Sequence, residues 1–130
     1  MSEIRIIIAG TRDFNRYDIL EPEVADFVDE FKNCNPECII TIVSGGARGA
    51  DLLGECFAKE HGFKLVRFPA DWKKYGKHAG PIRNRKMLNY AKEETGVLLA
   101  FWDRKSRGTR NMIDIAKDAG IIVKVIPVII

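Results

Sequence analysis

The chain has 130 residues, of which 46% are hydrophobic and 30% are charged, and its formal net charge is +3. This length and composition predict one globular domain, residues 1–130, which can bury a core without disulfides or structural metals. The small positive charge suits an anionic small molecule and argues against nucleic acid as the main partner, because nucleic acid usually binds a strongly basic face.

Membrane and metal sites are also disfavoured by the sequence. No apolar run approaches the roughly 18 residues that would span a bilayer, and the first residues read as a strand rather than a signal peptide. An odd number of cysteines, three, indicates free thiols in a reducing compartment, so we expect a cytoplasmic protein. Cys56 falls on the apolar stripe of a predicted helix and is expected in the core. We expect no metal and no cofactor.

Strands and helices alternate along the chain. Apolar runs predict strands at residues 4–9, 38–43, 64–68, 96–102 and 121–126. Amphipathic patterns predict helices from 18 or 21 to 32, at 50–61, from Pro81 to about 94, and at 109–119. Gly62 and Gly120 are placed to end two of these helices. Residues 69–80 are expected to form an irregular loop.

This alternation predicts an α/β fold. We expect a Rossmann-like three-layer sandwich with a mainly parallel five-stranded sheet in the order 3-2-1-4-5. Ligands of such sheets bind at the carboxyl ends of the strands, where the strand order reverses. The turns that follow the strands should therefore line one pocket.

The turn "SGGARGAD", from Ser44 to Asp51, joins a predicted strand to a predicted helix. Glycines permit positive φ and close approach of a ligand to the backbone, and a helix start favours an anion. Asp51 would cap the helix or hold a ribose hydroxyl. The turn lacks the P-loop ending and the GxGxxG spacing, and a plain strand-to-helix turn is the alternative interpretation. The residues expected to hold phosphate here are Ser44, Gly45, Gly46, Arg48 and Gly49.

Other strand-end turns add candidates to the same pocket. Arg83 stands four residues before Met87, so both lie on one helix face and Arg83 should point into the crevice, with surface solvation as the alternative. Thr109 would contact the ligand or serve as an N-cap. Trp72 is a candidate for stacking on a base. The remaining expected ligand contacts are Gly10, Thr11, Arg12, Asn84 and Gly108.

Four motifs, in this order, resemble the SLOG superfamily: "GTRDF", "SGGARGAD", "DWKKYGKHAGPIRNRKM" and "RGT". They are most similar to its YspA-like (cpYpsA-related) group. The resemblance implies a Rossmann-like domain that binds a nucleotide or nucleotide-derived ligand, such as an ADP-ribose-like molecule. It also implies phosphate binding by the glycines of "SGGARGAD" and by the Gly108–Thr109 turn, with Thr11, Arg12, Arg83 and Asn84 completing the pocket.

One departure bears on enzyme activity. LOG-type phosphoribohydrolases of the superfamily carry the signature "PGGxGTxxE", whereas this chain reads "SRGTRNM", with Met112 in place of the glutamate. Methionine cannot ionise, which leaves Asp51 as the candidate catalytic acid if the chain is an enzyme. We therefore expect a nucleotide sensor or binding domain. The alternatives are an Asp51-dependent nucleotide hydrolase and a DprA-like binder of single-stranded DNA. The apolar end "VIPVII" suggests a homodimer.

Overall fold

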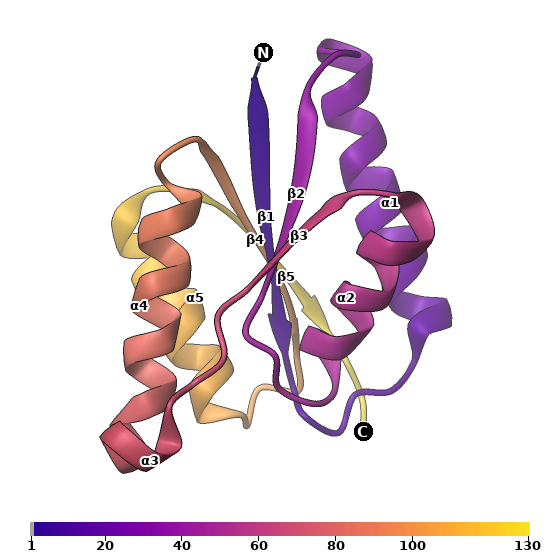
Figure 1. The fold of residues 1–130 in the computed structure, drawn as a ribbon. Helices are drawn as coiled ribbons and strands as arrows, with labels where there is room; N and C mark the ends of the chain where they lie inside the picture. Colours follow the sequence, from indigo (N-terminus) through magenta and orange to yellow (C-terminus); the bar gives the residue numbers. More distant parts are fainter. Residues whose placement is uncertain (1) are drawn as a thin grey trace.

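The computed structural model describes residues 2–130, whose five strands form one sheet (Figure 1). The strand order is β3-β2-β1-β4-β5 and every neighbouring pair is parallel, as the sequence predicts. The elements are β1 (Glu3–Gly10), α1 (Tyr17–Cys34), β2 (Ile39–Ser44), α2 (Ala50–His61), β3 (Lys64–Arg67), α3 (Trp72–Tyr75), the 3₁₀ turn η1 (Gly76–His78), α4 (Ala79–Ala91), β4 (Thr95–Trp102), α5 (Arg107–Ala119) and β5 (Ile122–Pro127).

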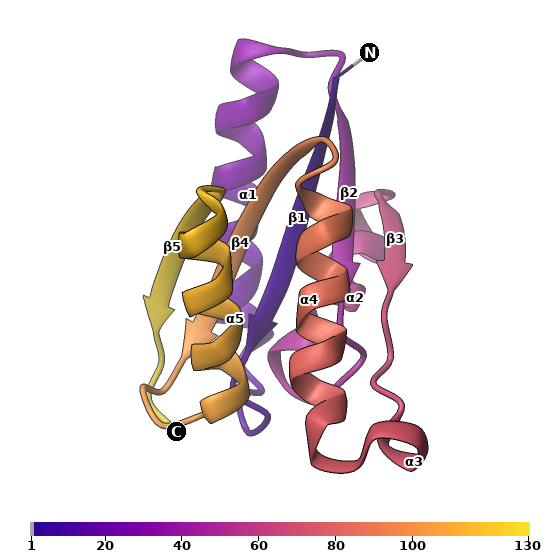
Figure 2. The same cartoon turned by 90° about the vertical axis from the view of Figure 1, so that its left-hand side faces the viewer.

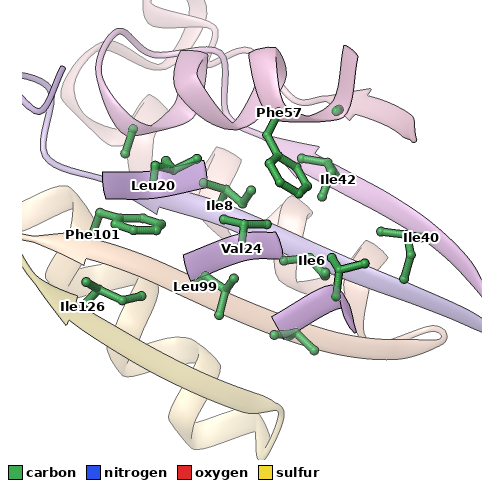
Figure 3. Packing of buried hydrophobic residues seen from close by; sticks show 14 of the residues in the cluster. Ile6, Ile8, Leu20, Val24, Ile40, Ile42, Phe57, Leu99, Phe101 and Ile126 are labelled. Atoms are coloured by element: carbon green, nitrogen blue, oxygen red, sulfur yellow. The ribbon is translucent and has the colours of Figure 1, made fainter. Parts of the chain in front are cut away.

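Two layers of helices cover the sheet. Helices α1 and α2 lie on one face and α4 and α5 on the other (Figures 1 and 2). Alternate residues of β1 serve the two faces: Ile6 and Ile8 pack with Leu20 and Phe57 under α1 and α2 (Figure 3), whereas Ile7 packs under α4 and α5. The near-continuous apolar run of β1 is thus explained by burial on both faces.

Helix α2 has the predicted bounds but not the predicted buried face. Gly62 ends it with φ +70°, as expected of a left-handed cap. Cys56, however, is exposed, so its assignment to the core was wrong. The reason is Gly54: a Cβ there would lie 2.9 Å from the Ile8 side chain, so the helix approaches β1 on its glycine side. That rotation buries Asp51 instead.

The segment at residues 69–80 is ordered into helical turns, so the prediction of an irregular loop was wrong. Asp71 caps α3 by accepting a hydrogen bond from the Lys74 amide at 3.1 Å. Turn η1 then leads directly into α4, which begins two residues before Pro81. Helix α5 likewise begins early: Ser106 is its N-cap and accepts a hydrogen bond from the Thr109 amide, so Thr109 is not the cap.

A cluster around Arg5 ties β1 to the end of α4, at the amino end of the sheet. The Arg5 guanidinium lies 3.8 Å from the centre of the Tyr90 ring and donates to the Tyr90 carbonyl at 2.7 Å. It also forms ion pairs with Glu3 and Glu93, each at 3.0 Å. Across residues 2–130, none of the helices combines the length and apolarity needed to cross a bilayer.

Candidate functional site

Three connected cavities lie at the carboxyl ends of the strands, and Arg12 and Arg83 line all three. The central cavity, about 290 Å³, lies between the end of β1 and the starts of α2, α4 and α5. The glycine-turn cavity, about 340 Å³, adds Gly45, Gly46, Arg48 and Trp72 to those two arginines. The α5-start cavity, about 290 Å³, adds Trp72, Lys77, Arg107 and Gly108. The strand-end turns therefore do meet at one crevice.

Arg83 is held in place by neutral partners. It lies in the second turn of α4, four residues before the buried Met87. Its Nη1 donates to the Gly45 carbonyl at 2.6 Å, and its Nε donates to the Asn84 side-chain oxygen at 3.0 Å. Burial lowers its pKa, an effect that the nearby Asp51 carboxylate opposes. Within residues 2–130 Arg83 forms no ion pair, so its remaining N–H groups are available to an anion.

Asn84 of α4 lines the central cavity, and its side chain forms hydrogen bonds to α5. Its Nδ2 donates to the Gly108 carbonyl at 3.1 Å and to the Asn111 side-chain oxygen at 3.0 Å. Its own oxygen accepts the bond from Arg83. With both amide donors engaged, Asn84 fixes the spacing of α4 and α5 beneath the cavity.

The glycines of the turns have two different explanations. A Cβ on Gly49, which has φ +85°, would collide with the carbonyl oxygens of Thr11 and Arg12. A Cβ on Gly10 would collide with the Phe101 carbonyl. Gly49 thus allows the turns after β1 and β2 to pack against each other, and Gly10 allows the end of β1 to lie against β4. Gly46, with φ +74°, instead faces the glycine-turn cavity.

Ser44 and Thr11 do not line the three cavities, because both hydroxyls are engaged within the fold. The Ser44 hydroxyl donates to Glu55 at 2.8 Å and accepts the Gly46 amide at 3.0 Å. Thr11 Oγ1 accepts the Asp103 amide at 3.1 Å. Their side chains therefore shape the turns rather than face the crevice.

Asp51 lies in the first turn of α2 and is only 5% exposed. One of its oxygens accepts the Ala47 amide at 3.3 Å. Burial raises the pKa of Asp51 to about 6, although the positive charge of Arg83 partly offsets that effect. Counting only the described residues, it is the one acid that lines the central cavity, whose lining also includes Met87 and Met112.

The outer wall of the crevice is formed by exposed side chains. The Arg12 guanidinium lies 5.8 Å from the centre of the Trp72 ring, and Trp72 is 49% exposed. Arg48 points to solvent and pairs with Asp13 at 3.3 Å. Lys77 and Arg107 also line the crevice, and the sequence analysis missed both.

The positions of these turns agree with a family match. The model of the YAcAr family, described as the YspA, cpYpsA-related SLOG family, matches residues 4–75. A curated relative, the Gene 61 protein of Mycobacterium phage D29, is 33% identical over 122 residues, which cover 90% of this chain and 91% of the phage protein. The chain belongs to the YspA, cpYpsA-related SLOG family. No solved structure matches it.

In this SLOG protein the family match and the site overlap in part. The matched residues include the turns after β1 and β2 and all of α3, and so include Arg12, Asp51 and Trp72. Arg83 and Gly108 come from α4 and α5, beyond the matched region. Membership of the SLOG family indicates a nucleotide-related binding domain.

Proposed function

We propose that this chain binds a nucleotide or nucleotide-derived small molecule at the three cavities and acts as a sensor or binding domain. The observation that carries the proposal is the convergence of Arg12 and Arg83 on all three cavities, with neither forming an ion pair in the part of the chain described. Guanidinium groups with free N–H donors bind phosphate through charge-assisted, fork-shaped hydrogen bonds. An anionic ligand would supply the partner that the protein itself does not.

The central cavity suits the uncharged part of a nucleotide. Met87 and Met112, both nearly fully buried, line it with apolar atoms, and the Asp51 carboxyl can accept a hydrogen bond from a sugar hydroxyl. Trp72, at the outer wall, offers a half-exposed ring on which a base can stack. Phosphate would then lie against the arginines, and the ring systems of the ligand against the apolar side chains.

A thermal-shift series tests the proposal. AMP, ADP, ATP, GTP, NAD, ADP-ribose and a short single-stranded DNA are compared, and a ligand at about 100 times its Kd should add roughly 2.7 kcal/mol of stability. That gain corresponds to a rise of several degrees in Tm. Arg83→Ala, which removes a charged hydrogen-bond donor, should reduce the shift to less than about half. Arg110→Ala, an exposed helix residue paired only with Asp114, is the matched control and should retain it. A full shift in Arg83→Ala would refute the proposal.

A second function, nucleotide hydrolysis, is favoured by Asp51. Its carboxyl is buried, lines the central cavity and has a raised pKa, three properties that cluster at catalytic acids and bases. Met112, at the position of the LOG-type glutamate, lines the same cavity, so Asp51 could act where that glutamate would. Chromatography of the incubated ligand decides the question. Hydrolysis would be supported if the wild type forms a product and Asp51→Asn forms none while it still binds the ligand. Unchanged ligand with the wild type would support a binding domain.

A further inference from the structure

The charges around the crevice are divided unevenly among its three cavities. The central cavity holds the Asp51 carboxyl. The glycine-turn cavity and the α5-start cavity lie beside it and are called the flanking cavities. Both are lined by cations and, within residues 2–130, by no acidic residue. The glycine-turn cavity has Arg48 as its own cation, and the α5-start cavity has Lys77 and Arg107. Each flanking cavity therefore has at least one cationic side chain of its own with which it can bind an anion.

The two flanking cavities share one wall. Trp72, Arg12 and Arg83 line both of them, and the Arg12 guanidinium lies 5.8 Å from the centre of the Trp72 ring. Their other lining residues come from different elements: the turn after β2 and the segment after β3 in one case, and η1 with the starts of α4 and α5 in the other. The cations thus form two groups around a shared arginine pair.

The central cavity borders both groups. It shares Ala47 with the glycine-turn cavity and Gly108 with the α5-start cavity. A phosphate inside it would meet the buried carboxylate of Asp51, and two like charges in a desolvated site repel strongly. An uncharged sugar meets no such penalty there.

We propose that the site binds a nucleotide with two separate phosphate groups, one in each flanking cavity, and with its sugar in the central cavity. This inference rests on the proposed function and specifies its ligand class. A nucleoside monophosphate, or a diphosphate whose two groups are adjacent, fills one flanking cavity and leaves the other without a phosphate. In the glycine-turn cavity the phosphate replaces or joins Asp13, which pairs with Arg48 in an exposed and therefore weak ion pair. A nucleoside 3′,5′-bisphosphate matches both.

Titration calorimetry of the full chain tests this inference. The probes are the 3′,5′-bisphosphates, 5′-monophosphates and 5′-diphosphates of adenosine and guanosine. We expect the bisphosphate with the preferred base to bind at least about tenfold more tightly than its monophosphate and diphosphate, since a charged hydrogen bond contributes that much or more. Arg48→Ala and Arg107→Ala should each weaken bisphosphate binding about tenfold, and only one of them should weaken monophosphate binding. Arg110→Ala should change neither.

The outcomes separate this inference from the proposed function. If a bisphosphate binds no more tightly than the diphosphate, or if both variants weaken monophosphate binding by equal factors, the crevice has one anion site and the inference is wrong. The proposed function would then still stand on the monophosphate result. If none of the nucleotides binds, both are wrong. Lys77→Ala provides a second variant of the α5-start cavity, and all three replaced side chains are exposed, so the fold should tolerate each change.

Discussion

Replacing Asp51 with asparagine should remove a pH-dependent cost from the free energy of unfolding. The folded pKa of Asp51 is raised from an ordinary 3.8 to about 6, so the folded state holds the proton more tightly than the unfolded chain. The contribution of Asp51 to the free energy of unfolding is therefore fully present below pH 4 and is lost as the pH rises through 6. A shift of about two units corresponds to roughly 3 kcal/mol in total, of which about 2 kcal/mol falls between about pH 4.5 and 7.5.

Urea unfolding of both proteins at those two pH values measures the effect. Asparagine keeps an oxygen that can accept the Ala47 amide, so the local hydrogen bond has a replacement. The stability of Asp51→Asn relative to wild type should rise by about 2 kcal/mol from the lower to the higher pH. Asp114→Asn, at an exposed position of α5, controls for the general effect of removing a charge. A constant difference between Asp51→Asn and wild type at both pH values would refute the reasoning from burial.

Three further predictions concern the turns and Trp72 of α3. Gly49→Ala should destabilise the fold by more than about 2 kcal/mol, because its Cβ would collide with backbone oxygens. Gly62 has a similar φ but open space around it, so Gly62→Ala should cost only about 1 kcal/mol. Urea unfolding of the two variants measures both effects. Ser44→Ala should cost about 1–3 kcal/mol in the same assay, because it leaves the Gly46 amide without its acceptor. Trp72→Phe should abolish most of the ligand-induced change in tryptophan fluorescence, and an undiminished change would place the ligand elsewhere.

The sheet was predictable because its signals are local and repeated. Apolar runs alternate with amphipathic helices, and right-handed crossovers leave few arrangements of five parallel strands, so the order of the strands could be derived. The ordered α3 was missed because its stabilising contact, the Asp71 cap, is a single hydrogen bond within a polar segment. The rotation of α2 was missed because Gly54 gives no hydrophobic signal, although it lies directly against Ile8 of β1.

The position of the candidate site was predictable from the sequence, but the roles of its individual side chains were not. The sequence located the crevice because every glycine-rich turn follows a strand. It could not show that the hydroxyls of Ser44 and Thr11 are engaged within the fold. Ser44 bonds to Glu55 in the following helix, and Thr11 bonds to Asp103, which follows β4. Glu55 was not singled out because an isolated acid in a helix usually faces solvent. Its spacing of four residues from Asp51 was the available signal, because both then lie on one helix face.

The Arg5 cluster and the crevice lie at opposite ends of the same sheet. Substitutions at the two ends share no contact partner, so their effects on stability should be nearly additive. Ligand preference could then drift over evolutionary time through changes in the strand-end turns, while the cluster that joins β1 to α4 retains the fold. Such a separation lets one scaffold acquire different small-molecule specificities without first gaining stability elsewhere.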